Sequence, residues 1–240
     1  MWILYLFLAV VAAAGFYAGR EPYIQIEMLS GRKVLHAALS IILLFALLFT
    51  AYSIGWFPQE IAAPFMMILY SIAAGFFAGY ALRLFTARSN AGSILYQNRS
   101  FLVDHAPNFF AIALILYGIY RSSVLTDLPI TGIRITSGLS IITFGIFGLT
   151  LKVVPEFRTK GIMFLDRMIH WKQLLSWKWI SEEVLSVDYF ERTSKKEISI
   201  KSLVTSVPPE DRKQAEAILK MKLDQFAEER NKDLHPDEDS

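Results

Sequence analysis

The chain has 240 residues, of which 54% are hydrophobic, 19% are charged and none is cysteine. This apolar excess is too large for one ordinary soluble domain, so insertion into a membrane is the first hypothesis. The absence of cysteine excludes disulfide bonds, thiolate metal sites and thiol nucleophiles.

Charged residues are divided unevenly along the chain. Residues 1–155 carry nine Lys or Arg and five Asp or Glu, whereas the last 85 residues carry 15 and 17. The boundary near Pro155 therefore separates a lipid-soluble part from a water-soluble one. Because the second part is nearly balanced in charge, we expect no nucleic-acid partner, which would need a basic field.

Five segments approach the roughly 20 apolar residues that a membrane-spanning helix needs. The first has no Lys or Arg before its apolar run, which indicates a retained anchor and not a cleaved signal peptide. The fourth is the weakest, because the run from Asn108 to Tyr120 is short and its extension brings in Pro107, where we expect a kink. The predicted all-α bundle has spans at residues 1–19, 34–56, 61–82, 101–120 and 135–154.

The Lys and Arg residues between these segments indicate how the chain crosses the membrane. Residues 20–33 and 83–100 carry three each, and residues 57–60 carry none. Since basic residues are retained on the cytoplasmic side, this pattern predicts an outside N-terminus and a cytoplasmic C-terminus. The mildly basic loop with Arg121 and Arg134 is the exception.

Two GxxxG patterns lie in the first and third segments, Gly15 with Gly19 and Gly75 with Gly79. Small residues four apart let helix backbones approach closely, which is a main source of helix association in lipid. These glycines predict a compact bundle. They leave open whether the partner helix belongs to the same chain.

After Pro155 the apolar residues alternate with polar ones, as in half-buried strands. Residues 161–165 and 168–171 flank an expected turn at Asp166 and Arg167, and later strands are expected at 175–179, at 184–190 and from Ile198. Residues 191–197 are expected to form a turn. The pattern predicts an antiparallel meander of four or five strands.

An amphipathic helix is expected from Glu210 to about Glu229, after Pro208 and Pro209. Its apolar stripe would cover the sheet, and it ends a domain of residues 156–229. Residues 230–240 have almost no apolar content and are predicted to form a disordered acidic tail. The stripe consists of Ala215, Ile218, Leu219, Leu223 and Phe226.

The order of residues in this domain resembles that of bacterial PH-like domains at the cytoplasmic ends of small membrane proteins. The resemblance covers about residues 157–226. It implies a curved antiparallel sheet closed by a C-terminal helix, a role in binding or assembly, and a place at the bacterial inner membrane. The residues that carry it are Gly161, Ile162, Phe164, Ile169, Trp171, Leu174, Trp177, Trp179 and the helix from Glu210.

Two features depart from the PH-like pattern. The expected strands are one or two fewer than a full PH-like barrel needs. The basic loop that binds lipid in eukaryotic relatives is not evident, because Lys195 and Lys196 are the only lysines together in a turn. We therefore carry over no phosphoinositide site.

The sequence offers few residues for chemistry. Its membrane part contains no HExxH, GxGxxG or P-loop pattern and no paired acids at metal spacing, and we expect no metal and no cofactor. Arg99, Asp104 and His105 form the densest polar group near membrane depth. Either the acid orients the histidine for proton transfer or ligand binding, or the group is a polar helix start. His36 is interpreted as a residue at the level of the lipid headgroups.

Three tryptophans, Trp171, Trp177 and Trp179, lie within nine residues. They fit either the core of a small sheet or a face that binds a partner. Deciding between the two requires knowing which side of the strands meets the final helix.

The leading hypothesis is a membrane protein without enzymatic activity, acting as an anchor, scaffold or accessory subunit. Its partners would be the lipid bilayer and other membrane or cytoplasmic proteins. One alternative is a small transporter or channel in which His36, Asp104 and His105 line a path. The other is a membrane enzyme that acts on lipid through Arg99, Asp104 and His105.

Overall fold

A computed structural model describes residues 2–22, 31–98, 101–152, 154–192 and 198–234 of the chain. The chain divides into two compact units. We call Met1–Thr86 with Asp104–Leu151 the helical unit, and Ala87–Val103 with Lys152–Ser240 the sheet unit. Each unit is therefore built from two separate stretches of the sequence.

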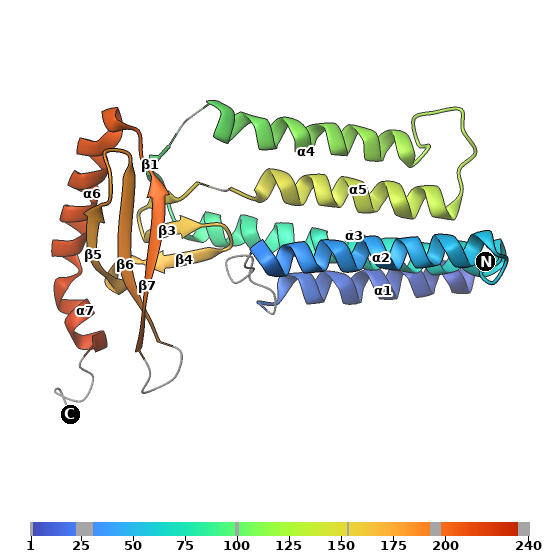
Figure 1. Ribbon diagram of the computed structural model, residues 1–240, viewed down its shortest axis with the longest axis horizontal. Helices are drawn as coiled ribbons and strands as arrows, with labels where there is room; N and C mark the ends of the chain where they lie inside the picture. Colours follow the sequence, from blue (N-terminus) through green and yellow to red (C-terminus); the bar gives the residue numbers. More distant parts are fainter. Residues whose placement is uncertain (1, 23–30, 99–100, 153, 193–197, 235–240) are drawn as a thin grey trace. The chain divides into compact units, whose positions relative to one another are not determined.

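Five helices lie where the five apolar segments were predicted (Figure 1). Within the described residues, four helices are long and apolar enough to cross a membrane, which indicates a membrane protein: α1, the part of α2 from Leu35, α3 and α5. The fourth predicted span, α4, is a continuous helix through Pro107 but is not among these four. The helices are α1 Trp2–Arg20, α2 Gly31–Ser53, α3 Gln59–Asn90, α4 Phe101–Arg121 and α5 Gly132–Thr150.

Two helix ends differ from the prediction. Helix α3 continues eight residues beyond 82, because residues 83–90 contain neither Gly nor Pro and the left-handed Gly92 (φ 85°) comes after them. At 32 residues, α3 is about 48 Å long, more than the roughly 30 Å of a hydrocarbon core. Helix α5 covers 132–150 and not 135–154, since the chain becomes extended at Leu151.

The four glycines of the GxxxG patterns lie where α1 and α3 pack. A Cβ atom added to any of them would come within 3.0 Å of a backbone atom of the other helix: Gly15 meets Ile72, Gly19 meets Phe76, Gly75 meets Ala12 and Gly79 meets Phe16. The partner helix is therefore in the same chain. Glycine is required here because the two backbones leave no room for a side chain.

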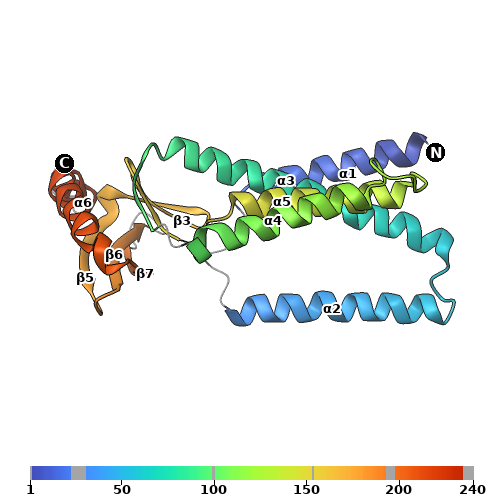
Figure 2. The same ribbon diagram turned by 90° about the horizontal axis from the view of Figure 1, so that it is seen from above.

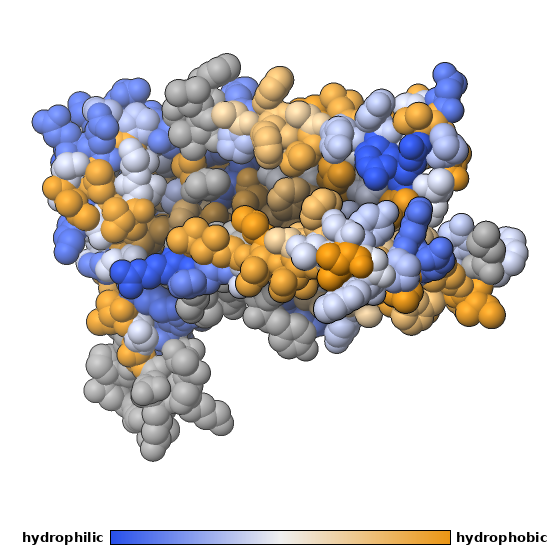
Figure 3. Space-filling model, turned by 45° about the vertical axis from the view of Figure 1, so that its right-hand side comes forward, coloured by the Kyte–Doolittle hydropathy of each residue, from blue (hydrophilic) through white to orange (hydrophobic). Residues whose placement is uncertain are grey.

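Helices α4 and α5 pack in a similar way, which the sequence reasoning did not foresee for Gly118. A Cβ atom on Gly118 would lie 2.8 Å from Ile142, and one on Gly138 would lie 2.7 Å from Ser122. Helix α2 instead has no buried side chain among those described from Leu35 to Ser53, and Figure 2 shows it set apart from the other helices. Apolar side chains cover much of the helical surface in Figure 3, as expected where lipid is the solvent.

The sheet unit holds two antiparallel sheets in place of the single meander that was predicted. One has the order β1-β2-β3-β4 and the other the order β5-β6-β7. The short 3-10 helix η2 (Trp171–Gln173) connects them. The strands are β1 Ile94–Gln97, β2 Glu156–Arg158, β3 Gly161–Phe164, β4 Arg167–His170, β5 Leu174–Trp179, β6 Val184–Arg192 and β7 Ile198–Ser206.

Strand β1 comes from the stretch between α3 and α4 that was predicted to be a loop. It pairs antiparallel with β2, which follows α5, so two helices are inserted between neighbouring strands. Four residues are too few to show a clear alternation, and the pairing partner lies far along the chain. Strands β1 and β2 are the two that the sequence analysis missed.

The remaining strand boundaries follow the prediction closely. The first hairpin turns at Leu165 and Asp166, one residue before the expected place, with Leu165 in the left-handed region (φ 52°). Strand β6 extends to Arg192, into the expected turn, and residues 193–197 lie outside the described part. Leu185, Val187 and Tyr189 share one face of β6, as predicted, and all three are buried.

The C-terminal helix closes the core of the sheet unit. Helix α6 (Arg212–Gln225) contacts β1 and β5, one strand from each sheet, and Ala215 and Leu219 are fully buried in this contact. A second helix, α7 (Ala227–Leu234), contacts η2. The predicted disordered tail thus begins with helix at 230–234, where Arg230 donates to the carbonyl of Leu174. Residues 235–240 lie outside the described part.

Candidate functional site

Trp171 is a core residue. It is 1% exposed, its ring packs edge-on against Phe157, and its indole N–H donates to the carbonyls of Arg158 (2.9 Å) and Thr159 (3.1 Å). A buried indole with its polar atom satisfied stabilises the core and offers nothing to a partner. Of the two interpretations of the tryptophans, the core interpretation applies to Trp171.

Trp177 and Trp179 also face inward. Both lie on the core face of β5, partly buried against the hydrophobic cluster. The indole N–H of Trp179 donates to Glu216 of α6 at 2.6 Å, and the Arg212 guanidinium lies over its ring at 4.6 Å. Arg212 also bonds Glu216 at 3.1 Å, so one carboxylate holds both groups. These contacts orient α6 on β5.

The polar residues proposed near membrane depth are only partly described. Arg99 lies outside the described residues, as does the side chain of Asp104. His105 is exposed in the first two turns of α4, and His36 is exposed on α2. Among the described residues, no group of three or more His, Asp or Glu is placed to hold a metal ion.

A buried ion pair joins β2 to the end of α3. Glu156 is 3% exposed, and its carboxylate accepts from two nitrogens of Arg158, at 2.7 Å and 2.6 Å. The third nitrogen of Arg158 donates to the carbonyls of Arg88 (3.1 Å) and Gly92 (2.8 Å). Arg158 thus places a cation at the C-terminal end of α3, bonded to one carbonyl of its last turn and to one just beyond the helix.

The outer face of the second sheet carries a small polar network. Asp188 on β6 accepts hydrogen bonds from Ser202 on β7 (2.5 Å) and Ser176 on β5 (3.1 Å). These hydroxyl groups, Ser202 first, hold the pKa of Asp188 below its ordinary value. The network links all three strands at the solvent-facing surface.

A second carboxylate ties the two sheets together. Glu191 on β6 pairs with Arg167 of β4 at 2.8 Å and with Lys201 of β7. The Lys201 ammonium, followed by Arg167, lowers the pKa of Glu191. Arg167 also lies over the ring of Tyr189 at 5.1 Å. This group occupies the positions at which the sheets meet.

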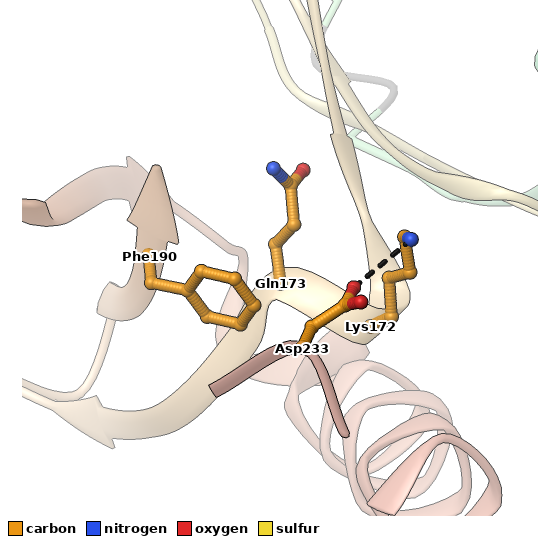
Figure 4. Close-up of a pocket in the computed structure, with 4 residues that line it drawn as sticks. All are labelled: Lys172, Gln173, Phe190 and Asp233. Carbon is orange, nitrogen blue, oxygen red and sulfur yellow. Dashed lines mark ion pairs between the residues drawn. The ribbon is translucent and has the colours of Figure 1, made fainter. Parts of the chain in front are cut away.

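Two hollows mark the surface near the C-terminal helices. One, of about 250 Å³, is lined by Lys172, Gln173, Phe190 and Asp233, and the Lys172–Asp233 ion pair (2.9 Å) lies at its side (Figure 4). The other, of about 340 Å³, follows β1 from Ile94 to Gln97 and reaches Asp211 and Gln214. Both are shallow, and neither gathers a nucleophile with a base among the described residues that line it.

Strand β7 is the most exposed apolar element of the sheet unit. It is an edge strand with a single neighbour, β6, over the described residues. Ile198, Ile200 and Val204 point to the outer face, and Ile200 is 68% and Val204 55% exposed. The alternating pattern from Ile198 predicted that β7 is a strand. Its position at the edge of the sheet follows only from the order of the strands in the structure.

Comparison with known proteins identifies the sheet-forming part of the chain without naming an activity. Residues 153–224 match a family model described as "Domain of unknown function (DUF5673)". The match runs from before β2 nearly to the end of α6 and leaves out β1 and the helical unit. No curated protein and no solved structure matches the chain.

Proposed function

We propose that this chain is a bacterial inner-membrane protein without enzymatic activity, whose cytoplasmic sheet unit binds a protein partner. In this role it anchors or braces an assembly as a scaffold or accessory subunit. Five spans, an outside N-terminus and a cytoplasmic C-terminus follow from the apolar segments and from the basic loops at 20–33 and 83–100.

The observation that carries this proposal is the way the chain passes between its two units. The sheet unit includes the last turn of α3, then β1, and resumes with β2 after α5. Residues 98–100 connect β1 to α4, and residues 151–155 connect α5 to β2. Because each residue spans at most about 3.5 Å, these short connections tether the binding module to the membrane at three points. Such tethering would keep a bound partner close to the membrane, which fits an anchor or brace.

The arrangement of strands supports a PH-like domain. The sequence fell one or two strands short of a full PH-like barrel, and β1 and β2 add two to the strands that were expected. The resemblance implies one curved sheet, and two antiparallel sheets with one helix in contact with both are compatible with it. PH-like domains serve binding and assembly, which agrees with the shallow hollows of the sheet unit.

Purification of the tagged full-length chain from gently solubilised membranes tests the proposal. We expect a second protein to co-purify in fixed proportion. Trp171→Ala removes the largest buried side chain of the sheet unit and should abolish this recovery while the protein remains in the membrane. Trp56→Ala, at an 83% exposed tryptophan between α2 and α3, is the matched control and should retain the partner.

Two results would contradict the proposal. One is recovery of the wild-type chain alone and monomeric. The other is a partner that Trp171→Ala still retains after its sheet unit has unfolded, because the helical unit would then be the binding part.

A further inference from the structure

Strand β7 is an unusually regular edge. It pairs with β6 over nine consecutive positions, from Ile198 opposite Arg192 to Ser206 opposite Val184, without a bulge. Ile198, Ile200, Ser202 and Val204 lie on one face by the two-residue period of a strand. The core side of the strand is marked by Leu203, which is buried. The edge is therefore long, flat and partly apolar.

Edge strands of soluble domains are normally protected against pairing by charged side chains, proline or bulges. β7 contains no proline, and its one charged residue is Lys201. The Lys201 ammonium pairs with Glu191 on the neighbouring strand β6, so its charge is largely neutralised within the sheet. The edge thus lacks the usual protection, which indicates that another strand covers it.

In the sequence of β7, ISIKSLVTS, two of the four pairs of positions about Ser202 match in residue type. Ile200 and Val204, both β-branched and apolar, lie two residues before and two residues after Ser202. Ser199 and Thr205, which both carry a hydroxyl group, lie three residues before and three residues after it. An antiparallel strand of the same sequence, centred on Ser202, would place Ile200 opposite Val204 and Ser199 opposite Thr205. Lys201 would face Leu203, so no two like charges would stand directly opposite each other.

We propose that β7 pairs antiparallel with β7 of a second copy of this chain, about a two-fold axis at Ser202. The resulting contact is isologous, since the same residues meet from both sides. Across this axis the apolar pair of Ile200 with Val204 and the hydroxyl pair of Ser199 with Thr205 would each form twice, so a second copy of β7 complements the edge. Copies confined to one membrane also meet at a raised effective concentration, which favours self-pairing.

A hollow at the end of β7 fits this arrangement. It measures about 270 Å³ and lies beside Val204–Ser206, and it is also lined by Asn98, Val154, Pro155 and Phe164. The carbonyl of Ser206, at the last position of β7, already accepts a hydrogen bond from the side chain of Asn98 at 3.3 Å. Pairing would bring the partner's Ile198 next to Ser206, where the apolar lining of the hollow receives its side chain. This inference does not rest on the proposed function, because the chain can pair with itself whether or not a second protein binds.

Single-cysteine cross-linking tests the pairing directly, because the chain contains no cysteine. Residues directly opposite across an antiparallel pair have Cβ atoms close enough for a disulfide. Mild oxidation of the full-length Ser202→Cys protein in membranes should convert most chains into a disulfide-linked dimer of twice 27.3 kDa. Ser176→Cys is the matched control, because Ser176 also donates to Asp188 but lies two strands away, and it should remain monomeric.

A second variant separates pairing from random collision. Val204→Lys in the Ser202→Cys chain places a charge opposite the partner's Ile200 and should abolish the cross-link, whereas the neutral β-branched Val204→Thr should preserve it. Light scattering of the cysteine-free protein in detergent should likewise give a dimer for the original chain and a monomer for Val204→Lys. Equal cross-linking of Ser202→Cys and Ser176→Cys, or a monomeric original chain, would overturn the proposal. Capture of a different protein by the Ser202→Cys thiol would also overturn it.

Discussion

The phenol of Tyr96 donates a hydrogen bond to a carboxylate oxygen of Asp211 at 3.3 Å, across 115 positions of the sequence. Tyr96 belongs to β1, before α4, and Asp211 ends the turn that leads into α6. The ring of Tyr96 also packs on Phe157 of β2. This contact therefore holds the inserted strand and the closing helix together.

Tyr96→Phe should weaken this junction while preserving the ring contact with Phe157. We expect the free energy of unfolding of the sheet unit to fall by about 1 kcal/mol, the usual net value of one hydrogen bond. Denaturant unfolding followed by tryptophan fluorescence measures the change. Tyr117→Phe, at an exposed tyrosine of α4, is the control and should leave the curve unchanged.

The same variant should alter stability at high pH. Burial, followed by the negative charge of Asp211, raises the pKa of Tyr96 above its ordinary value of 10.0. Ionisation of the phenol is therefore harder in the folded state than in the unfolded chain. The stabilisation that the neutral phenol provides is fully present below about pH 10. As the pH rises beyond 10, the wild type should lose more stability than Tyr96→Phe. Parallel curves for the two proteins between pH 9 and 11 would refute this.

Glu191 should affect the stability of the sheet unit at acid pH. Lys201 and Arg167 lower its pKa below the ordinary 4.5, so the unfolded chain binds its proton more readily than the folded one. The stabilisation is present above about pH 4.5 and is lost as the pH falls through the lower folded-state pKa. Glu191→Gln should therefore flatten the acid limb of the stability profile. Glu182→Gln, at an exposed position between β5 and β6, should retain the full slope.

Arg158→Ala should be the most destabilising of these substitutions. It leaves the buried carboxylate of Glu156 without its bonded partner and removes the donor to the carbonyl of Arg88 in the last turn of α3 and to the carbonyl of Gly92 just after it. Loss of one member of a buried pair costs about 3–5 kcal/mol. The matched exposed pair is Lys172 with Asp233, for which Lys172→Ala should cost about 1 kcal/mol or less. Similar losses for both variants in denaturant unfolding would contradict the burial argument.

Gly75→Ala should separate α1 from α3. The added Cβ atom would overlap the backbone of Ala12, and overpacking of this kind costs roughly 1–3 kcal/mol. We expect a lower temperature of thermal aggregation in detergent. At Gly148 an added Cβ atom meets only the side chain of Ala111, at 3.2 Å, so Gly148→Ala should have a smaller effect. An equal or larger effect at Gly148 would show that the α1–α3 contact does not depend on glycine.

Local patterns predicted much of this structure. Unbroken apolar runs located the five helices of the membrane part, because helix length and apolar composition are properties of a single segment. Alternation located β5 and β6 and placed Leu185, Val187 and Tyr189 on the buried face. The apolar stripe of the last helix was likewise correct at Ala215 and Leu219. In each case the pattern of apolar side chains within the element is enough to predict which of its faces is buried.

The tertiary structure decided which segments meet. The sequence alone left open the partner of the GxxxG helices and the direction in which Trp177 and Trp179 face, and it missed β1. These outcomes depend on contacts between residues far apart in the chain, such as Gly75 with Ala12, Trp179 with Glu216 and Tyr96 with Asp211. The four residues of β1 are too few to show the alternation that predicts a strand. They form a strand because β2 pairs with them and α6 packs against them.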